Sequence, residues 1–194
     1  MVKAANQRRR SLSCRLSLRA LVANRSAVSA VEFALILPVM LSLYLGGIQI
    51  SQALSINRKV GHVTSTLGDL VAQSKSLAGT DVQDIFDASS SVMAPYAATP
   101  LTITVTEIAI DANSKATVAW SDARNATALT PGASVTLPAA LVQANTFVVA
   151  AVAHYPFTPT IGYILTGSFD LNSTYYLSPR LSKCISRSPY ICSS

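Results

Sequence analysis

The side chain in this sequence with the clearest chemical consequence is Glu32, the single acid within the apolar run Arg25–Ile50. A run of this length predicts one membrane-spanning helix over residues 28–50. A carboxylate close to lipid is expensive unless a positive group neutralises it, so Glu32 is a candidate functional residue. Either Glu32 has a positive partner, or it lies at the membrane edge, where water or Arg25 neutralises it.

A second candidate site is the pair Cys184 and Cys192, eight positions apart near the C-terminus. In an oxidising compartment two such thiols form a disulfide, which here closes a short loop around Pro189. Zinc binding is the alternative, but two thiols without a nearby histidine or third cysteine make an incomplete zinc site. We therefore predict a disulfide and no metal site. Cys14, in the basic N-terminal segment, is expected to be a free thiol.

No residue pattern typical of an enzyme occurs elsewhere. The sequence contains no GxSxG, CxxC or HExxH motif and no glycine-rich phosphate loop. His62 and His154 are expected on a helix surface and in a strand, and Asp81, Asp84 and Asp87 along the solvated edge of a helix. We therefore predict that the protein is not an enzyme and binds no cofactor.

The charge is concentrated at one end of the chain. Seven of the 15 Lys and Arg residues lie within residues 1–27, where there is no acid, whereas residues 33–194 carry eight basic and eight acidic residues. A nucleic-acid-binding protein carries basic charge on its folded domain, so we expect no nucleic-acid partner. A basic segment before an apolar helix predicts a cytoplasmic N-terminus and a C-terminal part outside the cytoplasm. A removed signal peptide is the alternative, but this apolar run is long for one.

The segments after the membrane helix predict an α+β domain over residues 51–194. Apolar residues spaced by three and four predict that the helix continues to about Lys75; they are Ala53, Ile56, Val60, Val63, Leu67 and Leu70. Either the protein's own domain or neighbouring subunits cover this apolar stripe. A short second helix is expected from Thr80 or Asp81 to about Met93.

Residues that alternate between apolar and polar from Leu101 onward predict a small antiparallel sheet. Two strands are expected to begin at Leu101 and at Ala116. A central strand is expected from Thr146 to Tyr155, and a last strand over Phe169–Leu177. The alternation changes phase near Ile108, which suggests a bulge. The predicted organisation is thus a basic cytoplasmic leader (1–27), a transmembrane helix (28–50) and a periplasmic α+β domain (51–194).

The segment from Ala27 to Pro38, AVSAVEFALILP, resembles the opening of TadE-like proteins. Four later segments fit the same resemblance; they are Arg58–Val60, Leu67–Val71, Val118–Ala123 and Tyr176–Arg180. The clearest resemblance covers about residues 26–68. TadE-like and TadG-like proteins are pseudopilin-like components of the bacterial Tad (Flp) pilus, a type IV pilus system, and the choice between the two branches stays open.

The resemblance implies a pilin-like fold and a structural role as a minor pilin, pseudopilin or assembly component, with other pilin-like subunits as partners in the inner membrane. It implies that a prepilin peptidase cuts between Ala27 and Val28, although the family usually has glycine where this chain has Ala27. It also implies an assembly role for Glu32, Phe33 and Pro38, with Glu32 pairing to a neighbouring subunit. The alternative is a single-pass anchor for a periplasmic binding or adhesive domain, in which Glu32 is incidental.

Overall fold

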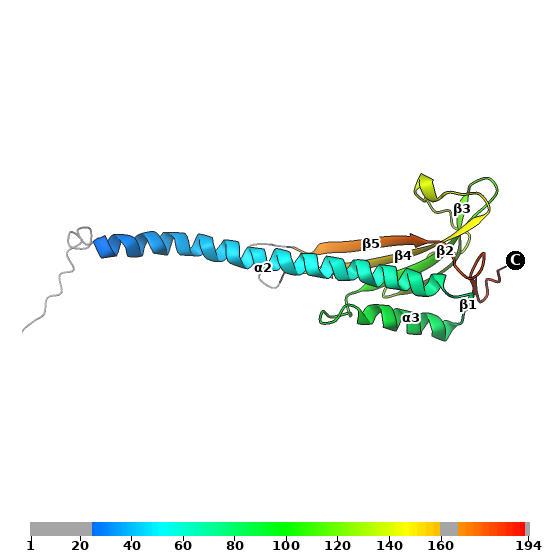
Figure 1. The fold of residues 1–194 in the computed structure, drawn as a ribbon, viewed down its shortest axis with the longest axis horizontal. Helices are drawn as coiled ribbons and strands as arrows, with labels where there is room; N and C mark the ends of the chain where they lie inside the picture. Colours follow the sequence, from blue (N-terminus) through cyan, green and yellow to red (C-terminus); the bar gives the residue numbers. More distant parts are fainter. Residues whose placement is uncertain (1–24, 160–166, 193–194) are drawn as a thin grey trace, which may run out of the picture. The chain divides into compact units, whose positions relative to one another are not determined.

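The structure is a computed structural model that describes residues 25–159 and 167–192. The chain divides into two compact units, residues 1–45 and 46–194. Helix α2 (Arg25–Ala72) begins in the first unit and ends in the second. The fold is α+β, with a long apolar N-terminal helix, a short second helix and a small antiparallel sheet, which confirms the predicted class (Figure 1).

Among the described residues, none packs on the part of α2 in the first unit, whose apolar side chains are mostly exposed. The helix is long and apolar enough to cross a membrane. Its most apolar stretch of 18 residues has a mean hydropathy of 2.0, and none of these residues is buried. It continues through Pro38, where the missing N–H is tolerated without a break. One turn later the Ser42 hydroxyl donates to the Pro38 carbonyl oxygen at 2.7 Å. Length and composition thus suit a single membrane span.

In the second unit, α2 packs by its apolar stripe on the protein's own sheet. Helix α3 (Gly79–Ser91) joins the same core. This core also contains sheet residues such as Val149 and Ala151. Its buried helix residues are Ile56, Val60, Val63, Leu67, Val71, Val82 and Phe86. The stripe is therefore covered by the domain itself and not left for neighbouring subunits.

Helix α3 begins earlier than predicted. Its N-cap position is Ala78, whose backbone N–H donates to Oδ2 of Asp81 at 2.8 Å. Asp81 therefore supports the helix start from three residues inside it, as the acid of a capping box does, rather than from the cap position itself. The helix ends at Ser91, close to the predicted end at Met93.

Four antiparallel strands in the order β3-β2-β4-β5 form the main sheet, which confirms the predicted sheet and the interior place of the 146–155 strand. The strands are β2 (Thr102–Ile110), β3 (Ala116–Arg124), β4 (Thr146–Phe157) and β5 (Phe169–Leu177). A 3-10 turn (Ala139–Leu141) lies between β3 and β4. The short strands β1 (Ser76–Leu77) and β6 (Ser186–Arg187) pair in parallel, which fixes the C-terminal segment beside the end of α2.

The phase change within β2 marks a change in which face of the sheet is buried. Ile103 and Val105 face the core that contains the helices. Ile108 and Ile110 belong to a second core on the opposite face, to which Leu137 of the β3–β4 loop contributes. Each half of β2 therefore buries a different face, which produces the shifted alternation seen in the sequence.

The predicted bulge is confirmed, and the extra residue lies in β3. Glu107 is opposite Trp120, but the next residue of β2, Ile108, is opposite Val118, so Ala119 has no partner in the register. An extra residue of this kind turns the neighbouring side chains of the bulged strand. Here it places Trp120 beside Glu107 in the helix-facing core.

Candidate functional site

Glu32 lies on α2 among exposed apolar side chains. Its neighbours Val28 and Phe33 have 47% and 65% of their surfaces accessible, and Glu32 is exposed as well. The peptide bond between Ala27 and Val28 lies near the start of α2. An amino group created there would precede Glu32 by one helical turn, about 6 Å along the axis. The cut, and the roles of Glu32, Phe33 and Pro38 in assembly, stay predictions.

Gly68 marks a close approach between α2 and β5. A Cβ added to Gly68 would collide with Cδ1 of Leu177 and would lie 3.4 Å from the Cβ of Ala151. The absence of a side chain is what lets the helix backbone sit this near the sheet. A side chain at position 68 would therefore require the Leu177 side chain to move.

An ion pair lies one residue beyond this contact. Asp69 pairs with Arg180 at 2.5 Å, and the Arg180 N–H donates to the Ala72 carbonyl oxygen at 2.9 Å. Both partners of the ion pair are about half exposed, so its electrostatic contribution is small. The ion pair connects the segments 67–71 and 176–180, which are two of the segments that carry the family resemblance.

We expect Gly68→Ala to give no net stabilisation, because its Cβ requires the Leu177 side chain to move and this cost of about 1 kcal/mol offsets the gain in helix propensity. Gly61→Ala is the matched control on the same helix, since a Cβ there meets nothing within 4 Å. That control should stabilise by about 0.5–1 kcal/mol. Thermal unfolding of the full-length protein in detergent micelles, followed by circular dichroism, measures both. Equal stabilisation by the two variants would contradict the close contact.

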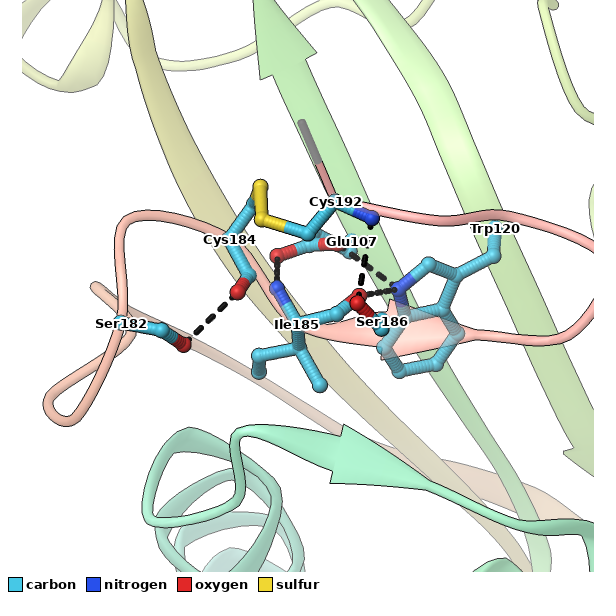
Figure 2. Close-up of a disulfide and its surroundings, with 7 residues drawn as sticks. All are labelled: Glu107, Trp120, Ser182, Cys184, Ile185, Ser186 and Cys192. Atoms are coloured by element: carbon cyan, nitrogen blue, oxygen red, sulfur yellow. Dashed lines mark hydrogen bonds between the residues drawn. A yellow bond between two sulfur atoms is a disulfide. The ribbon is translucent and has the colours of Figure 1, made fainter. Parts of the chain in front are cut away.

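The second part of the site is a buried hydrogen-bonded cluster around Glu107, which Figure 2 shows beside the disulfide. Glu107 is fully buried. Its Oε2 accepts from Nε1 of Trp120 and its Oε1 accepts from the backbone N–H of Ile185, both at 2.7 Å. Trp120 Nε1 also donates to the Ile185 carbonyl oxygen at 2.9 Å. One carboxylate thus holds the C-terminal segment against the sheet.

The segment that Glu107 holds is closed by a disulfide between Cys184 and Cys192. The Cys184 carbonyl oxygen accepts from the Ser182 hydroxyl at 2.7 Å, and the Cys192 N–H donates to the Ser186 hydroxyl at 3.1 Å (Figure 2). Cys184 is buried. The covalent loop and the Glu107 hydrogen bonds therefore stabilise one and the same structure.

Burial raises the pKa of Glu107 from 4.5 to about 7. Loss of hydration disfavours the charged carboxylate, and this effect outweighs the hydrogen bonds from Ile185 and Trp120, which favour it. The pKa of Tyr190 is also raised, first by burial and then by the charge of Glu107. Between pH 4.5 and about 7 the folded protein therefore holds a proton at Glu107 that the unfolded chain has lost.

We expect the Glu107 contribution to stability to fall by about 3 kcal/mol as the pH rises through this window, because each pKa unit corresponds to about 1.4 kcal/mol. Below the window both states are protonated, and above it both are ionised, so the change is confined between them. Glu107→Gln removes the titration. The difference in unfolding free energy between wild type and Glu107→Gln, measured in urea at about pH 5 and about pH 8, gives the pH-dependent contribution of Glu107. Parallel pH profiles would contradict it.

Glu107 and Gly68 are the residues that sequence analysis did not single out. A signal for Glu107 existed, because it continues the inward phase of Leu101, Ile103 and Val105 and so places an acid at a core position. Gly68 carried no signal of its own. A glycine within a helical pattern does not reveal what lies against it.

The other titratable candidates serve the structure locally. His62 is exposed, and His154 Nδ1 lies 3.5 Å from an Asp170 carboxylate oxygen with both side chains largely exposed. Asp81 supports the start of α3, and Asp87 pairs with Arg124 at 2.5 Å. Within residues 25–159 and 167–192, no group of three or more His, Cys, Asp or Glu residues is placed to hold a metal ion.

Comparison with known proteins identifies the N-terminal part of the chain. No curated protein and no solved structure matches the chain. A family model does match, and it covers the exposed apolar part of α2, Glu32 and most of the stripe that packs on the sheet. The resemblance inferred from the sequence is thereby confirmed: residues 27–66 of this chain match the family of TadE-like proteins.

Proposed function

We propose that this chain is a structural, non-catalytic component of a bacterial Tad (Flp) pilus, acting as a minor pilin, pseudopilin or assembly component. The helix over residues 28–50 anchors it in the inner membrane, and the α+β domain faces the periplasm. The observation that carries the proposal is the coincidence of the TadE-like match, residues 27–66, with an exposed apolar helix that contains Glu32.

The proposed orientation rests on two observations. The leader contains seven basic residues and no acid, and such segments stay in the cytoplasm. The disulfide between Cys184 and Cys192 suits an oxidising compartment, which the periplasm provides. Both observations favour a cytoplasmic N-terminus and a periplasmic domain.

The proposed role of Glu32 follows from its position. It lies four residues, about 6 Å of helix, after Val28, which places it near the edge of the hydrocarbon layer. An ionised side chain near lipid gains most from a positive partner held at the same depth. The N-terminal amine of a neighbouring subunit, exposed by cleavage after Ala27, supplies such a charge at the matching level. Pairing of this kind sets the axial register between subunits.

Crosslinking from the helix tests the proposal. A photoreactive amino acid at Phe33, whose side chain is 65% exposed, should trap a pilin-like subunit of the Tad apparatus in the native host. The same probe at Asn113, in the exposed turn after β2, is the control and should not trap that subunit. If the protein fractionates with the membrane but Phe33 yields no such adduct, the assembly role is wrong. The protein would then be an anchored domain with a different task.

A further inference from the structure

An apolar groove opens on the second unit close to where the chain enters it. The groove has a volume of about 360 Å³ and is lined by Ile50, Ala53 and Leu54 of α2, by Phe157, Phe169 and Leu171 of the sheet, and by Asn57. Ile50 and Leu54 are each 55% exposed, and Phe169 is 45% exposed. Among the described residues that line the groove, none is charged. Exposed apolar surfaces of this kind often mark sites where a membrane or another protein docks.

The sheet side of the groove is formed where β4 ends and β5 begins. Phe157 is the last residue of β4 and Phe169 the first of β5, and they are partners in the strand register. Asp170 alternates to the other side of β5, where it lies near His154. The polar neighbours thus face away, and the groove keeps an apolar floor.

The occupant follows from the length of the uncharged helix. Residues 33–57 contain no charged side chain. About 30 Å of hydrocarbon corresponds to about 20 residues of helix, so a span that begins between Val28 and Glu32 ends between Ile48 and Gln52. Ile50 lies within that range, and Leu54 lies about 3 Å beyond its outer limit. The groove therefore begins at the depth where acyl chains meet the headgroup layer.

The first charged residue after Glu32 supports this placement. Arg58 is exposed on α2, one turn beyond Leu54. A cation at this distance reaches the phosphate level of a leaflet while the apolar residues before it remain among the acyl chains.

We infer that this groove is a lipid-docking surface, in which the outer face of the inner membrane covers Ile50, Leu54 and Phe169 with acyl chains. The inference rests on the membrane anchor of the proposed function and goes beyond it. The α+β domain then contacts the bilayer through this groove as well as being connected to it by the membrane helix. Its orientation toward neighbouring subunits is fixed before assembly begins.

Tryptophan reporters in lipid test the inference. Full-length Phe169→Trp and Leu54→Trp proteins, reconstituted one per nanodisc in phosphatidylethanolamine and phosphatidylglycerol, should show blue-shifted emission and lose most of it when brominated lipids are included. Wild type provides the background, because its single tryptophan, Trp120, is buried. Tyr175→Trp is the matched control. Tyr175 is 48% exposed on the same face of β5, six residues and about 20 Å further along.

Three results would overturn the inference. Red-shifted emission from both reporters without quenching would mean that water fills the groove. Blue-shifted emission without quenching would mean that protein, from this chain or a second copy, covers it. Equal quenching at position 175 would mean that lipid contact is not confined to the groove. Flotation of the same samples with liposomes reports the anchor separately, so a protein that floats without being quenched refutes this inference alone.

Discussion

Cells whose only copy of this protein carries Glu32→Ala should assemble no Tad pili and should lose attachment to surfaces. The substitution removes the one carboxylate of the apolar segment, and with it the pairing that we propose between subunits. The protein itself should still be made and inserted, because an alanine in this helix suits lipid better than an acid does. Electron microscopy of cell surfaces and a crystal-violet attachment assay measure the two losses.

The controls separate charge from position. Glu32→Gln keeps the side-chain volume but not the charge, and it should fail as Glu32→Ala does. Gln52→Ala changes a polar residue of the same helix and should leave piliation intact. N-terminal sequencing of the wild type shows whether the mature chain starts at Val28. Normal pili in Glu32→Ala cells that contain normal amounts of the protein would refute the proposed pairing.

Glu107→Ala should destabilise the domain by about 3 kcal/mol near pH 5, a large share of the 5–15 kcal/mol typical of natural domains. The Ile185 N–H loses its acceptor in a buried site, while Trp120 Nε1 keeps only the Ile185 carbonyl oxygen. A cavity replaces the rest of the side chain. Urea unfolding of the full-length protein in detergent micelles, followed by Trp120 fluorescence, gives the loss.

A second measurement shows whether the loss comes from the C-terminal segment. Hydrogen exchange of the Ile185 amide should be faster in Glu107→Ala, because the hydrogen bond that protects it is gone. Asp84→Ala removes an exposed acid of α3 and should change stability by less than about 0.5 kcal/mol. If Glu107→Ala is as stable as this control, the carboxylate does not hold the segment in place.

Local patterns in the sequence predicted most of the elements. The three-and-four spacing from Ala53 to Leu70 gave the second half of α2, and its central residues are buried as expected. The limits of β5, Phe169–Leu177, coincide with those predicted. These features depend on side-chain periodicity within one segment, and so a single sequence contains them.

Features that depend on distant partners were not predicted. The phase change in β2 was visible, but the second core around Leu137 that causes it was not. Glu107 was not recognised as a site because its partners, Trp120 and Ile185, lie 13 and 78 positions away. The contact of Gly68 with Leu177 was missed for the same reason. Periodicity places a side chain on a face but does not say what meets it there.

The pairing of β1 with β6 has a consequence for biogenesis. It joins residues directly after α2 to residues near the C-terminus, and the Glu107–Ile185 hydrogen bond also spans most of the domain. Contacts between such distant parts of a chain carry a large loop-closure entropy cost and slow folding. In a polypeptide threaded across a membrane from its N-terminal anchor, this core cannot close until the last residues have emerged. In the topology proposed above, translocation is therefore coupled to maturation, and a truncated chain would leave an open, protease-sensitive sheet.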